Sequence, residues 1–253
     1  MILHPLIPGQ STAEMILSLL RPDRQFTQEE ARLLDICLML HAEHGGGNNS
    51  TFTCRVLTSS GTDAYSAYAG AIGSLKGNRH GGANINASRM LEYMKAGIHN
   101  WEDEEEVTAF LKKILRKEAG DGTGLIYGMG HAVYTKSDPR ALILRENAMK
   151  MAAGTEYEPE FKLLNLVEKL TPAVFAEQKG DVKVMCANVD LYSGLVYRML
   201  GIPEELFTPL FACSRMAGWS AHRIEEMYNN HRIIRPAYKA IARPRKYIPL
   251  QER

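Results

Sequence analysis

Two histidines and one aspartate, each beside glycines or at the start of a helix-forming run, are the residues of this sequence best suited to chemistry. His80 lies in the segment 77–84 and is followed by two glycines, His131 lies in the segment 128–134, and Asp190 precedes a helical run. A neutral imidazole donates a hydrogen bond to a developing enolate oxygen, and a carboxylate accepts a proton. Together they indicate proton abstraction beside a carbonyl group.

Each of these residues also has an ordinary structural interpretation. His80 alone fits a satisfied structural histidine, and the pair Gly81-Gly82 favours a functional one. A helix N-terminus disfavours imidazolium, so the ring is expected to stay neutral. Asp190 alone fits a helix N-cap. With a free pKa of about 3.9 it is a weak base, so it needs an enolate stabilised by placed donors, and His80 is the expected donor.

A second histidine pair, His41 and His44, precedes the glycines of the segment 41–48. Residues three apart share a helix face, which brings zinc into consideration. However, the motif H-E-x-x-H is absent and no third ligand is marked, so we expect no metal. A structural pair at a helix end and ligand recognition at a glycine-terminated helix both remain open.

Three arginines near predicted helix ends or turns, Arg140, Arg215 and Arg235, could bind an anionic substrate. Taken singly, each is more simply a surface ion-pair partner. A guanidinium binds a carboxylate through two parallel hydrogen bonds. Three arginines beside a set of histidines therefore suit a dicarboxylate.

The composition bounds the class of protein. The chain has 253 residues, a formal net charge of +1 and four cysteines without close pairing. The charge gives no support to a general nucleic-acid or anionic-membrane role. The cysteine spacing favours reduced thiols inside the cell, and we expect a cytoplasmic protein. No apolar stretch is long enough for a membrane span.

The periodicity is helical nearly throughout, which predicts an all-α fold. Ser11 and Thr27 begin capping boxes, and Asp63 and Asp138 are expected N-caps. Helices are expected after Ser11, Thr27 and Asp63 and near 83–96, 102–117, 139–153, 158–169, 189–200 and 209–227. Only residues 182–185 look like a strand. We predict a small domain, 83–196, inserted into a larger helical domain formed by 1–82 and 197–253.

Several of these segments, in this order, resemble the citrate synthase family. The resemblance is carried by 41–48, 77–84, 128–134 with 138–140, 188–194 and Ser214-Arg215. It extends from the first helices to the C-terminal residues 243–247. It implies a multihelical acyltransferase that condenses acetyl-CoA with oxaloacetate to give citrate and CoA, the first step of the tricarboxylic acid cycle.

The resemblance also implies individual roles. His44 and His131 match oxaloacetate-binding histidines, and His131 polarises the ketone and protonates the alkoxide. His80 matches the residue that stabilises the enolate of acetyl-CoA, and Asp190 matches the base that removes the methyl proton. No permanently bound cofactor is implied, because acetyl-CoA is a cosubstrate.

Further positions match the binding residues of the family. Arg140 and Arg215 match carboxylate-binding arginines, and Arg235 resembles the arginine that the partner of a homodimer donates. The coenzyme A site is implied at Leu125, Ile126, Gly128, Gly130 and Asn188.

Two departures from the family pattern bear on function. Asn78 stands where a proline is usual, which alters the turn before His80. Members of the family also carry a long N-terminal helical segment before the region that matches Met1, so we expect a C-terminal portion of the fold. Two alternatives therefore stay open: a 2-methylcitrate synthase that uses propionyl-CoA, and a non-catalytic truncated fragment that binds a dicarboxylate.

Overall fold

A computed structural model describes residues 5–78, 80–130, 134, 136–180, 185–229, 232–237, 239, 241 and 245–253. Within these ranges the chain forms helices and no strand, so the predicted all-α class is confirmed. The α-helices are α1 (Thr12–Leu20), α2 (Gln28–Ala42), α3 (Asn49–Ser59), α4 (Ala64–Leu75), α5 (Ala83–Gly97), α6 (Glu104–Leu115), α7 (Pro139–Ala152), α8 (Glu158–Lys179), α9 (Asp190–Met199) and α10 (Phe207–Asn229). Two short 3₁₀ helices are η1 (Glu204–Leu206) and η2 (Leu250–Glu252).

The helix starts follow the capping signals of the sequence. The Ser11 hydroxyl accepts from the backbone N–H of Glu14, whose carboxylate accepts in return from the N–H of Ser11. The same reciprocal pair joins Thr27 and Glu30. Asp63 and Asp138 cap α4 and α7 through their side chains. These contacts satisfy N–H groups that have no partner inside the helix, so the predicted caps are confirmed.

Two helical segments differ from the prediction. Helix α3 was not predicted, because its sequence is rich in serine and threonine, which favour helices weakly. It forms because it packs between α4 and α10 and buries Cys54 completely. Helix α8 continues past Pro172 to Lys179, since burial of Val167 and Val174 compensates for the hydrogen bond that proline removes.

The predicted strand at 182–185 lies mostly outside the described residues. Residues 181–184 are not described, and Met185 belongs to no helix or strand. Nearby, Met129 and Ala187 form an isolated antiparallel bridge. This bridge joins the glycine-rich segment before His131 to the segment before α9.

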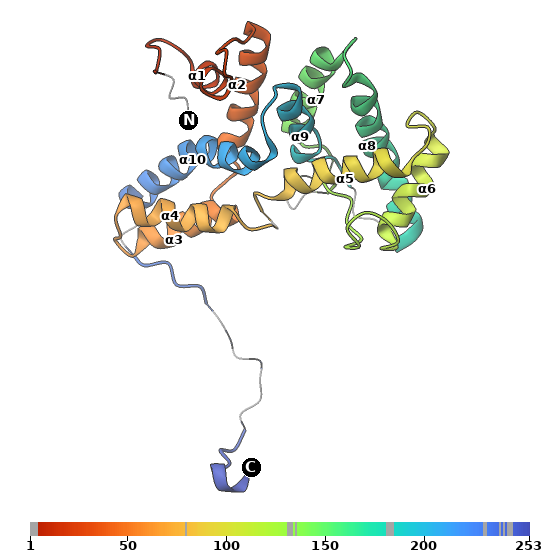
Figure 1. The fold of residues 1–253 in the computed structure, drawn as a ribbon. Helices are drawn as coiled ribbons and strands as arrows, with labels where there is room; N and C mark the ends of the chain where they lie inside the picture. The colour runs from red at the N-terminus through yellow and green to blue at the C-terminus, as the bar shows by residue number, and fades with distance from the viewer. Residues whose placement is uncertain are drawn as a thin grey trace.

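Two hydrophobic clusters hold the helices together. A small one lies between α3, α4 and α10, which lie close together in Figure 1, and is centred on Trp219. A larger one joins α1 and α2 to helices α5 to α9. The proposed division into two domains remains a prediction, and its second boundary, after residue 196, falls inside α9.

Four charged side chains form a closed ring that ties α5, α8 and α9 together. Glu160 pairs with Lys95 at 2.5 Å and with Arg198, and Glu92 pairs with the same two cations. The side chain of Glu160 is only 10% exposed, so its charge depends on these partners. Such an enclosed carboxylate is costly to remove, because the cations then face each other with less compensation.

We expect Glu160→Ala to lower the stability by about 2 kcal/mol, which corresponds to a fall of about 4–8 °C in Tm for a chain of this size. Thermal unfolding followed by circular dichroism measures this. The control is Lys150→Ala, which breaks an exposed pair with Glu146 at 2.9 Å and is expected to cost less than about 0.5 kcal/mol. Equal shifts for both variants would contradict the structural role of the ring.

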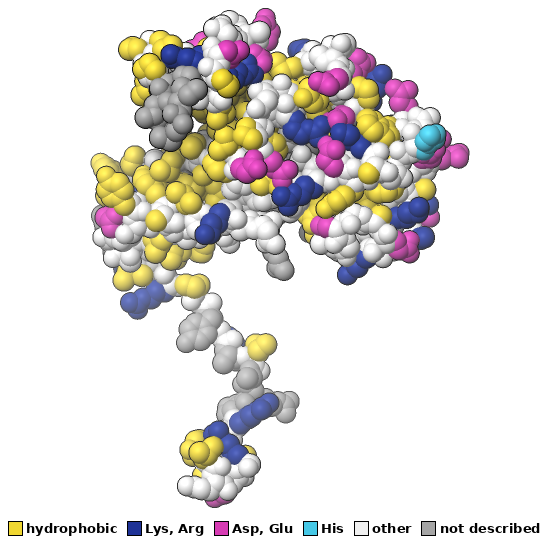
Figure 2. All heavy atoms as spheres, viewed as in Figure 1, with side chains coloured by type: hydrophobic (Ala, Val, Ile, Leu, Met, Phe, Trp, Pro, Cys, Tyr) yellow, Lys and Arg dark blue, Asp and Glu magenta, His cyan; other side chains and the backbone are white. Residues whose placement is uncertain are grey.

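Hydrophobic and charged side chains cover different parts of the surface. Figure 2 shows hydrophobic side chains gathered over the part formed by α3 and α4, and charged ones over α1 and α2 and over the part formed by α5 to α8. Exposed apolar residues of α3, α4 and α10 include Phe52, Tyr65, Ile224, Met227 and Tyr228. No helix among the described residues is long and apolar enough to cross a membrane.

Candidate active site

A pocket of about 300 Å³ lies where the ends of several helices meet. The loop after α2, the N-terminal turns of α5, α7 and α9 with the segments before them, and α10 supply its walls. Seven of the predicted site residues line it: His44, His80, Gly130, Arg140, Asn188, Asp190 and Arg215. Asn48, Ala83, Val189 and Phe211 complete the lining. Residues far apart in the sequence are thus brought together.

Backbone hydrogen bonds fix the glycine-rich segment before His131 against the start of α9. The N–H of Gly130 donates to the carbonyl of Cys186 at 2.7 Å, and the N–H of Asn188 donates to that of Gly128 at 2.9 Å. Gly128 has a φ of 79°, and a Cβ there would lie 2.6 Å from Leu191 Cα, so only glycine fits. The pairing places this segment beside the pocket.

The other predicted residues of this segment have different surroundings. Leu125 is 56% exposed, whereas Ile126 is 7% exposed and belongs to the hydrophobic core. The amide of Asn188 donates to the carbonyl of Gly130 at 2.9 Å. His131 lies outside the described residues, although its neighbour Gly130 lines the pocket.

Asp190 is the first residue of α9 rather than its N-cap. The N-cap is Val189, which makes no side-chain cap, and the N–H of Asp190 donates to Asn188 Oδ1 at 3.0 Å. The N-cap interpretation is therefore wrong. No described residue donates a hydrogen bond to the carboxylate of Asp190, which leaves it open to the pocket.

Burial raises the pKa of Asp190 to about 6; the charges of Arg140 and Arg215 oppose this shift, and the charge of Asp138 adds to it. The expectation of a weak base with an ordinary carboxyl pKa is corrected by this shift. A general base works best when its pKa lies near the working pH. Asp190 is therefore a stronger base than its residue type suggested, and it is still ionised at neutral pH.

His80 stands in the turn before α5 and is partly buried. Burial and the charge of Arg215 lower the pKa of His80 to about 4, so the ring is neutral at physiological pH, as predicted. The cause differs from the expected one, because the helix N-terminus is not the main effect. His80 Nε2 lies 3.0 Å from Ser50 Oγ.

The hydrogen bonds of Ser50 bear on which nitrogen of His80 carries the proton. Ser50 Oγ accepts a hydrogen bond from Trp219 Nε1 at 3.2 Å and has one proton to donate. It can donate to Asn48 Oδ1 at 3.1 Å or to His80 Nε2 at 3.0 Å. When it donates to His80, the ring proton resides on Nδ1, which then becomes a donor toward a ligand. Neither Ser50 nor Trp219 was predicted as a site residue.

Arg215 is a buried cation without a carboxylate partner among the described residues. Its side chain donates to the carbonyl of His41 at 2.6 Å and to Asn48 Oδ1 at 3.2 Å, and it lies 4.8 Å from the ring centre of Phe211. Burial lowers the pKa of Arg215 to about 10, which still leaves it protonated at neutral pH. A buried charge that is not paired favours an anionic ligand.

Arg140 differs from Arg215, because it forms an ion pair with Asp138, the N-cap of its own helix α7. Its guanidinium donates to both oxygens of Asp138, at 3.0 and 2.7 Å, and Asp138 is buried. Arg140 also lies 5.8 Å from the ring centre of Tyr134, and the His44 ring is 5.9 Å from the same ring. Asp138 thus holds the second cation of the pocket in place.

The predicted helix face shared by His41 and His44 does not exist, because α2 ends at Ala42. His41 is buried, and its Nδ1 contacts the carbonyl of Cys37 at 2.7 Å. Burial lowers the pKa of His41 to about 4. His44 alone faces the pocket. In the part of the chain that the structure describes, no three His, Cys, Asp or Glu side chains group as a metal site.

Arg235 is a predicted substrate-binding residue that the structure places outside the pocket. It is exposed, it follows α10, and it does not line the pocket. Its neighbour Ile234 donates its N–H to Ser59 Oγ of α3 at 3.0 Å, whereas the described residues 245–253 lie away from the helical body in Figure 1.

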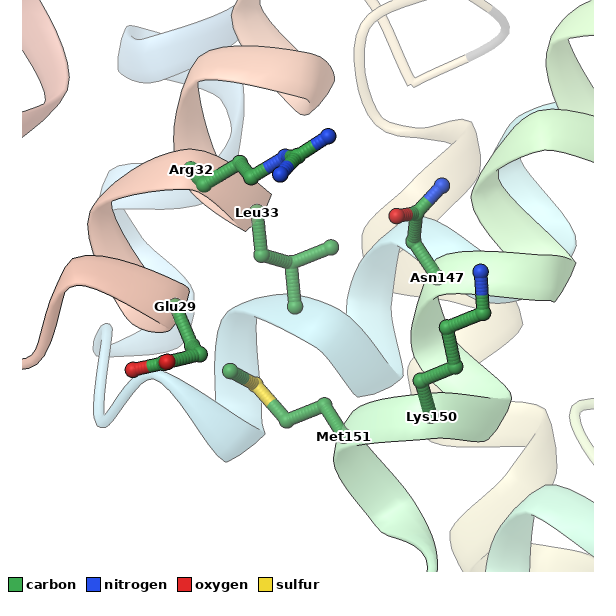
Figure 3. A pocket seen from close by; sticks show the side chains of 6 residues that line it. All are labelled: Glu29, Arg32, Leu33, Asn147, Lys150 and Met151. Carbon is green, nitrogen blue, oxygen red and sulfur yellow. The ribbon is translucent and has the colours of Figure 1, made fainter.

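A second hollow, of about 280 Å³, lies between α2 and α7 (Figure 3). Leu33 and Met151 form its apolar part, and Glu29, Arg32, Asn147 and Lys150 surround them. Arg32 and Lys150 are exposed, and Lys150 already pairs with Glu146. This hollow holds no histidine and no buried charge, so the chemistry belongs to the first pocket.

Comparison with known proteins agrees with this geometry. The family model for the citrate synthase C-terminal domain matches residues 2–237. The chain belongs to the citrate synthase family. A 2-methylcitrate synthase of Shewanella oneidensis is 41% identical over 224 residues, which cover 88% of this chain and 54% of that protein. A citrate synthase of Synechocystis is 41% identical over 224 residues, covering 88% and 52%.

A solved structure shows the same fold. It is the ternary complex of carboxymethyl coenzyme A and oxaloacetate with the citrate synthase of Thermoplasma acidophilum, with a TM-score of 0.79 and 31% identity. It matches 98% of this chain and 61% of its own. The chain thus spans about half the length of the curated relatives it matches.

Proposed function

We propose that the protein condenses acetyl-CoA with oxaloacetate to give citrate and CoA, as an acyltransferase of the citrate synthase type. One observation carries the proposal: His80, Asp190 and the unpaired cation Arg215 line one pocket of about 300 Å³. This combination supplies an enolate donor, a base and a carboxylate-binding group. Both substrates are consumed, citrate and CoA are released, and no permanently bound cofactor is needed.

Oxaloacetate binds first in this account, because the pocket is cationic before any ligand enters. Arg215 pairs with one carboxylate, and Arg140, held by Asp138, with the other. His44 adds a hydrogen bond from the loop after α2. His131, by its family role, polarises the ketone. The bound dicarboxylate thereby presents its carbonyl carbon to the thioester.

The acetyl group is then activated. Asp190 takes a proton from the methyl carbon, the C–H electron pair forms the enolate double bond, and negative charge moves to the thioester oxygen. His80 donates from Nδ1 to that oxygen. A placed donor of this kind stabilises the transition state by about 3–4 kcal/mol. Without it, a carboxylate with a pKa of about 6 is too weak a base for a thioester methyl group.

Condensation and hydrolysis complete the reaction. The enolate carbon attacks the ketone carbon of oxaloacetate, a C–C bond forms, and the ketone oxygen becomes an alkoxide that His131 protonates. Water then adds to the carbonyl of the citryl thioester, the C–S bond breaks, and CoA leaves as the thiol. Citrate and CoA are the products.

Steady-state release of CoA tests the proposal, with acetyl-CoA and propionyl-CoA assayed in parallel. We expect acetyl-CoA to have the higher kcat/KM, by about 10–200-fold, because one methylene in an apolar pocket changes the transition-state energy by about 1–3 kcal/mol. A preference for propionyl-CoA would indicate a 2-methylcitrate synthase, the activity that names one of the relatives above. Oxaloacetate binding without any CoA release would indicate the non-catalytic dicarboxylate-binding alternative.

Arg215→Ala is expected to weaken oxaloacetate binding about 100-fold, because the charge-assisted pair between the buried guanidinium and a substrate carboxylate is lost. Isothermal titration calorimetry measures the Kd. Arg32→Ala removes an exposed cation of the second hollow and is the control, for which no change is expected. If both variants bind oxaloacetate like the parent protein, Arg215 does not recognise the substrate.

The assembly proposed here is a homodimer in which Arg235 completes the pocket of the partner subunit. Two features support it: Arg235 is exposed and lies outside its own pocket, and apolar side chains of α3, α4 and α10 are exposed. Apolar patches of this kind mark association surfaces. Light scattering is expected to give twice the monomer mass. We also propose a cytoplasmic location, in keeping with four free cysteines.

A further inference from the structure

The loop of residues 43–48 carries two groups into the pocket, His44 and Asn48, although it has no regular secondary structure. Asn48 Oδ1 contacts both Arg215 and Ser50, so the position of this loop affects the dicarboxylate site and the enolate donor together. What holds the loop therefore matters for both halves of the reaction. Its restraints come from charged residues that do not line the pocket.

Glu43 connects the start of the loop to α10. Its Oε1 accepts hydrogen bonds from the backbone N–H of Gly45 and from His222 Nε2, the latter at 3.0 Å. Burial alone would raise the pKa of Glu43, but the bonds from His222 and from backbone N–H groups outweigh it and the pKa is lowered. The carboxylate is thus ionised, and it is held by one donor in its own loop and one donor in α10.

Helix α10 has a glycine where this carboxylate packs. A Cβ at Gly218 would lie 2.3 Å from the carbonyl oxygen of Ala42 and 2.4 Å from Glu43 Oε2. The first of these atoms is backbone and cannot move alone. Only glycine at 218 lets the loop approach α10 this closely.

A second contact restrains the same loop from α3. Arg55 Nη1 donates to the carbonyl of Gly46 at 3.2 Å, and Arg55 Nε pairs with Glu226 at 3.2 Å. Glu226 is 2% exposed, so it anchors Arg55 firmly. Glu43, bound to α10 through His222, therefore holds the N–H of Gly45, and Arg55 of α3 holds the carbonyl of Gly46.

We propose that Glu43, held by His222, is a positioning residue that sets the location of His44 and Asn48 for substrate binding. The inference rests on the proposed function for its kinetic consequence, but not for its structural one. Glu43 touches no substrate in this account. It acts through the loop, so its loss raises the Kd for oxaloacetate more than it lowers kcat.

Three variants test the inference. Glu43→Ala removes the acceptor, Glu43→Gln keeps an acceptor oxygen, and Glu225→Ala is the matched control. The exposed carboxylate of Glu225 lies 3.5 Å from His222 Nδ1 and forms no hydrogen bond or ion pair with residues 43–48. Hydrogen exchange of the peptide containing residues 43–50 reports on the loop itself, calorimetry on oxaloacetate binding, and steady-state kinetics on kcat.

For Glu43→Ala we expect faster exchange in this peptide alone, a Kd for oxaloacetate about tenfold higher, and a kcat within about threefold of the parent, because a displacement near 1 Å weakens positioned contacts. Glu43→Gln and Glu225→Ala are expected to match the parent. Unchanged exchange in Glu43→Ala, or a kcat that falls with unchanged Kd, would overturn the inference. If the parent protein itself does not bind oxaloacetate, the proposed function fails and the exchange experiment still decides whether Glu43 holds the loop.

Discussion

Replacing Asp190 with asparagine is expected to lower kcat by about 10³-fold while oxaloacetate binding changes less than about threefold. The amide has nearly the same shape as the carboxylate but cannot accept the methyl proton. Arg140 and Arg215, the proposed ligands of the dicarboxylate, are left intact. The loss should therefore appear in the chemical step rather than in affinity.

The pH dependence gives an independent check of the same residue. The base acts when it is deprotonated, so kcat/KM should rise with pH, reach half its limit near the pKa of Asp190, about 6, and stay level above it. An ordinary aspartate would place this midpoint near 4. Asp103→Asn, which alters the N-cap of α6 and does not line the pocket, is the control variant and should leave rate and pH profile unchanged. Turnover in Asp190→Asn equal to that of the parent would exclude Asp190 as the base.

Replacing His80 with alanine is expected to lower kcat by about 10²–10³-fold, because the enolate then loses its neutral hydrogen-bond donor. The effect should persist across neutral pH, since the pKa of His80 is lowered to about 4 and the ring does not change charge there. Steady-state kinetics with saturating oxaloacetate measures it.

Ser50→Ala provides the companion variant for His80. It removes the hydroxyl that selects the tautomer but keeps the ring, so a smaller loss, about tenfold, is expected. If Ser50→Ala were as inactive as His80→Ala, the hydroxyl would have a role beyond orienting the ring. If His80→Ala kept full activity, another group would have to stabilise the enolate.

The sequence was most informative where local chemistry determines local structure. Capping boxes at Ser11 and Thr27 and the caps at Asp63 and Asp138 were read from residue type alone and are present. Such contacts involve residues three or fewer apart, so they need no knowledge of the tertiary fold. Helix α3 was missed because its stability comes from packing against α4 and α10, which a local pattern does not contain.

In the candidate site, too, the sequence motifs predicted which residues take part, whereas effects of tertiary packing were not predicted. The motifs predicted that His80, His131 and Asp190 share one site. His80 and Asp190 line one pocket together with Arg215, and His131 lies outside the described residues. The shift of the Asp190 pKa was not foreseen, because it depends on the enclosure that other segments provide. Ser50 and Trp219 were also missed, since a serine or tryptophan in a helix has no signal of its own until the partner lies beside it.

The most direct test of the account is a crystal structure of the protein with oxaloacetate and carboxymethyl coenzyme A, whose carboxymethyl group stands in for the acetyl group. We expect the Asp190 carboxylate about 3–3.5 Å from the carbon that replaces the methyl group, His80 Nδ1 within hydrogen-bonding distance of the adjacent carboxyl oxygen, and Arg215 on a carboxylate of oxaloacetate. Both ligands bound in the pocket with Asp190 and His80 remote from the carboxymethyl group would contradict the mechanism.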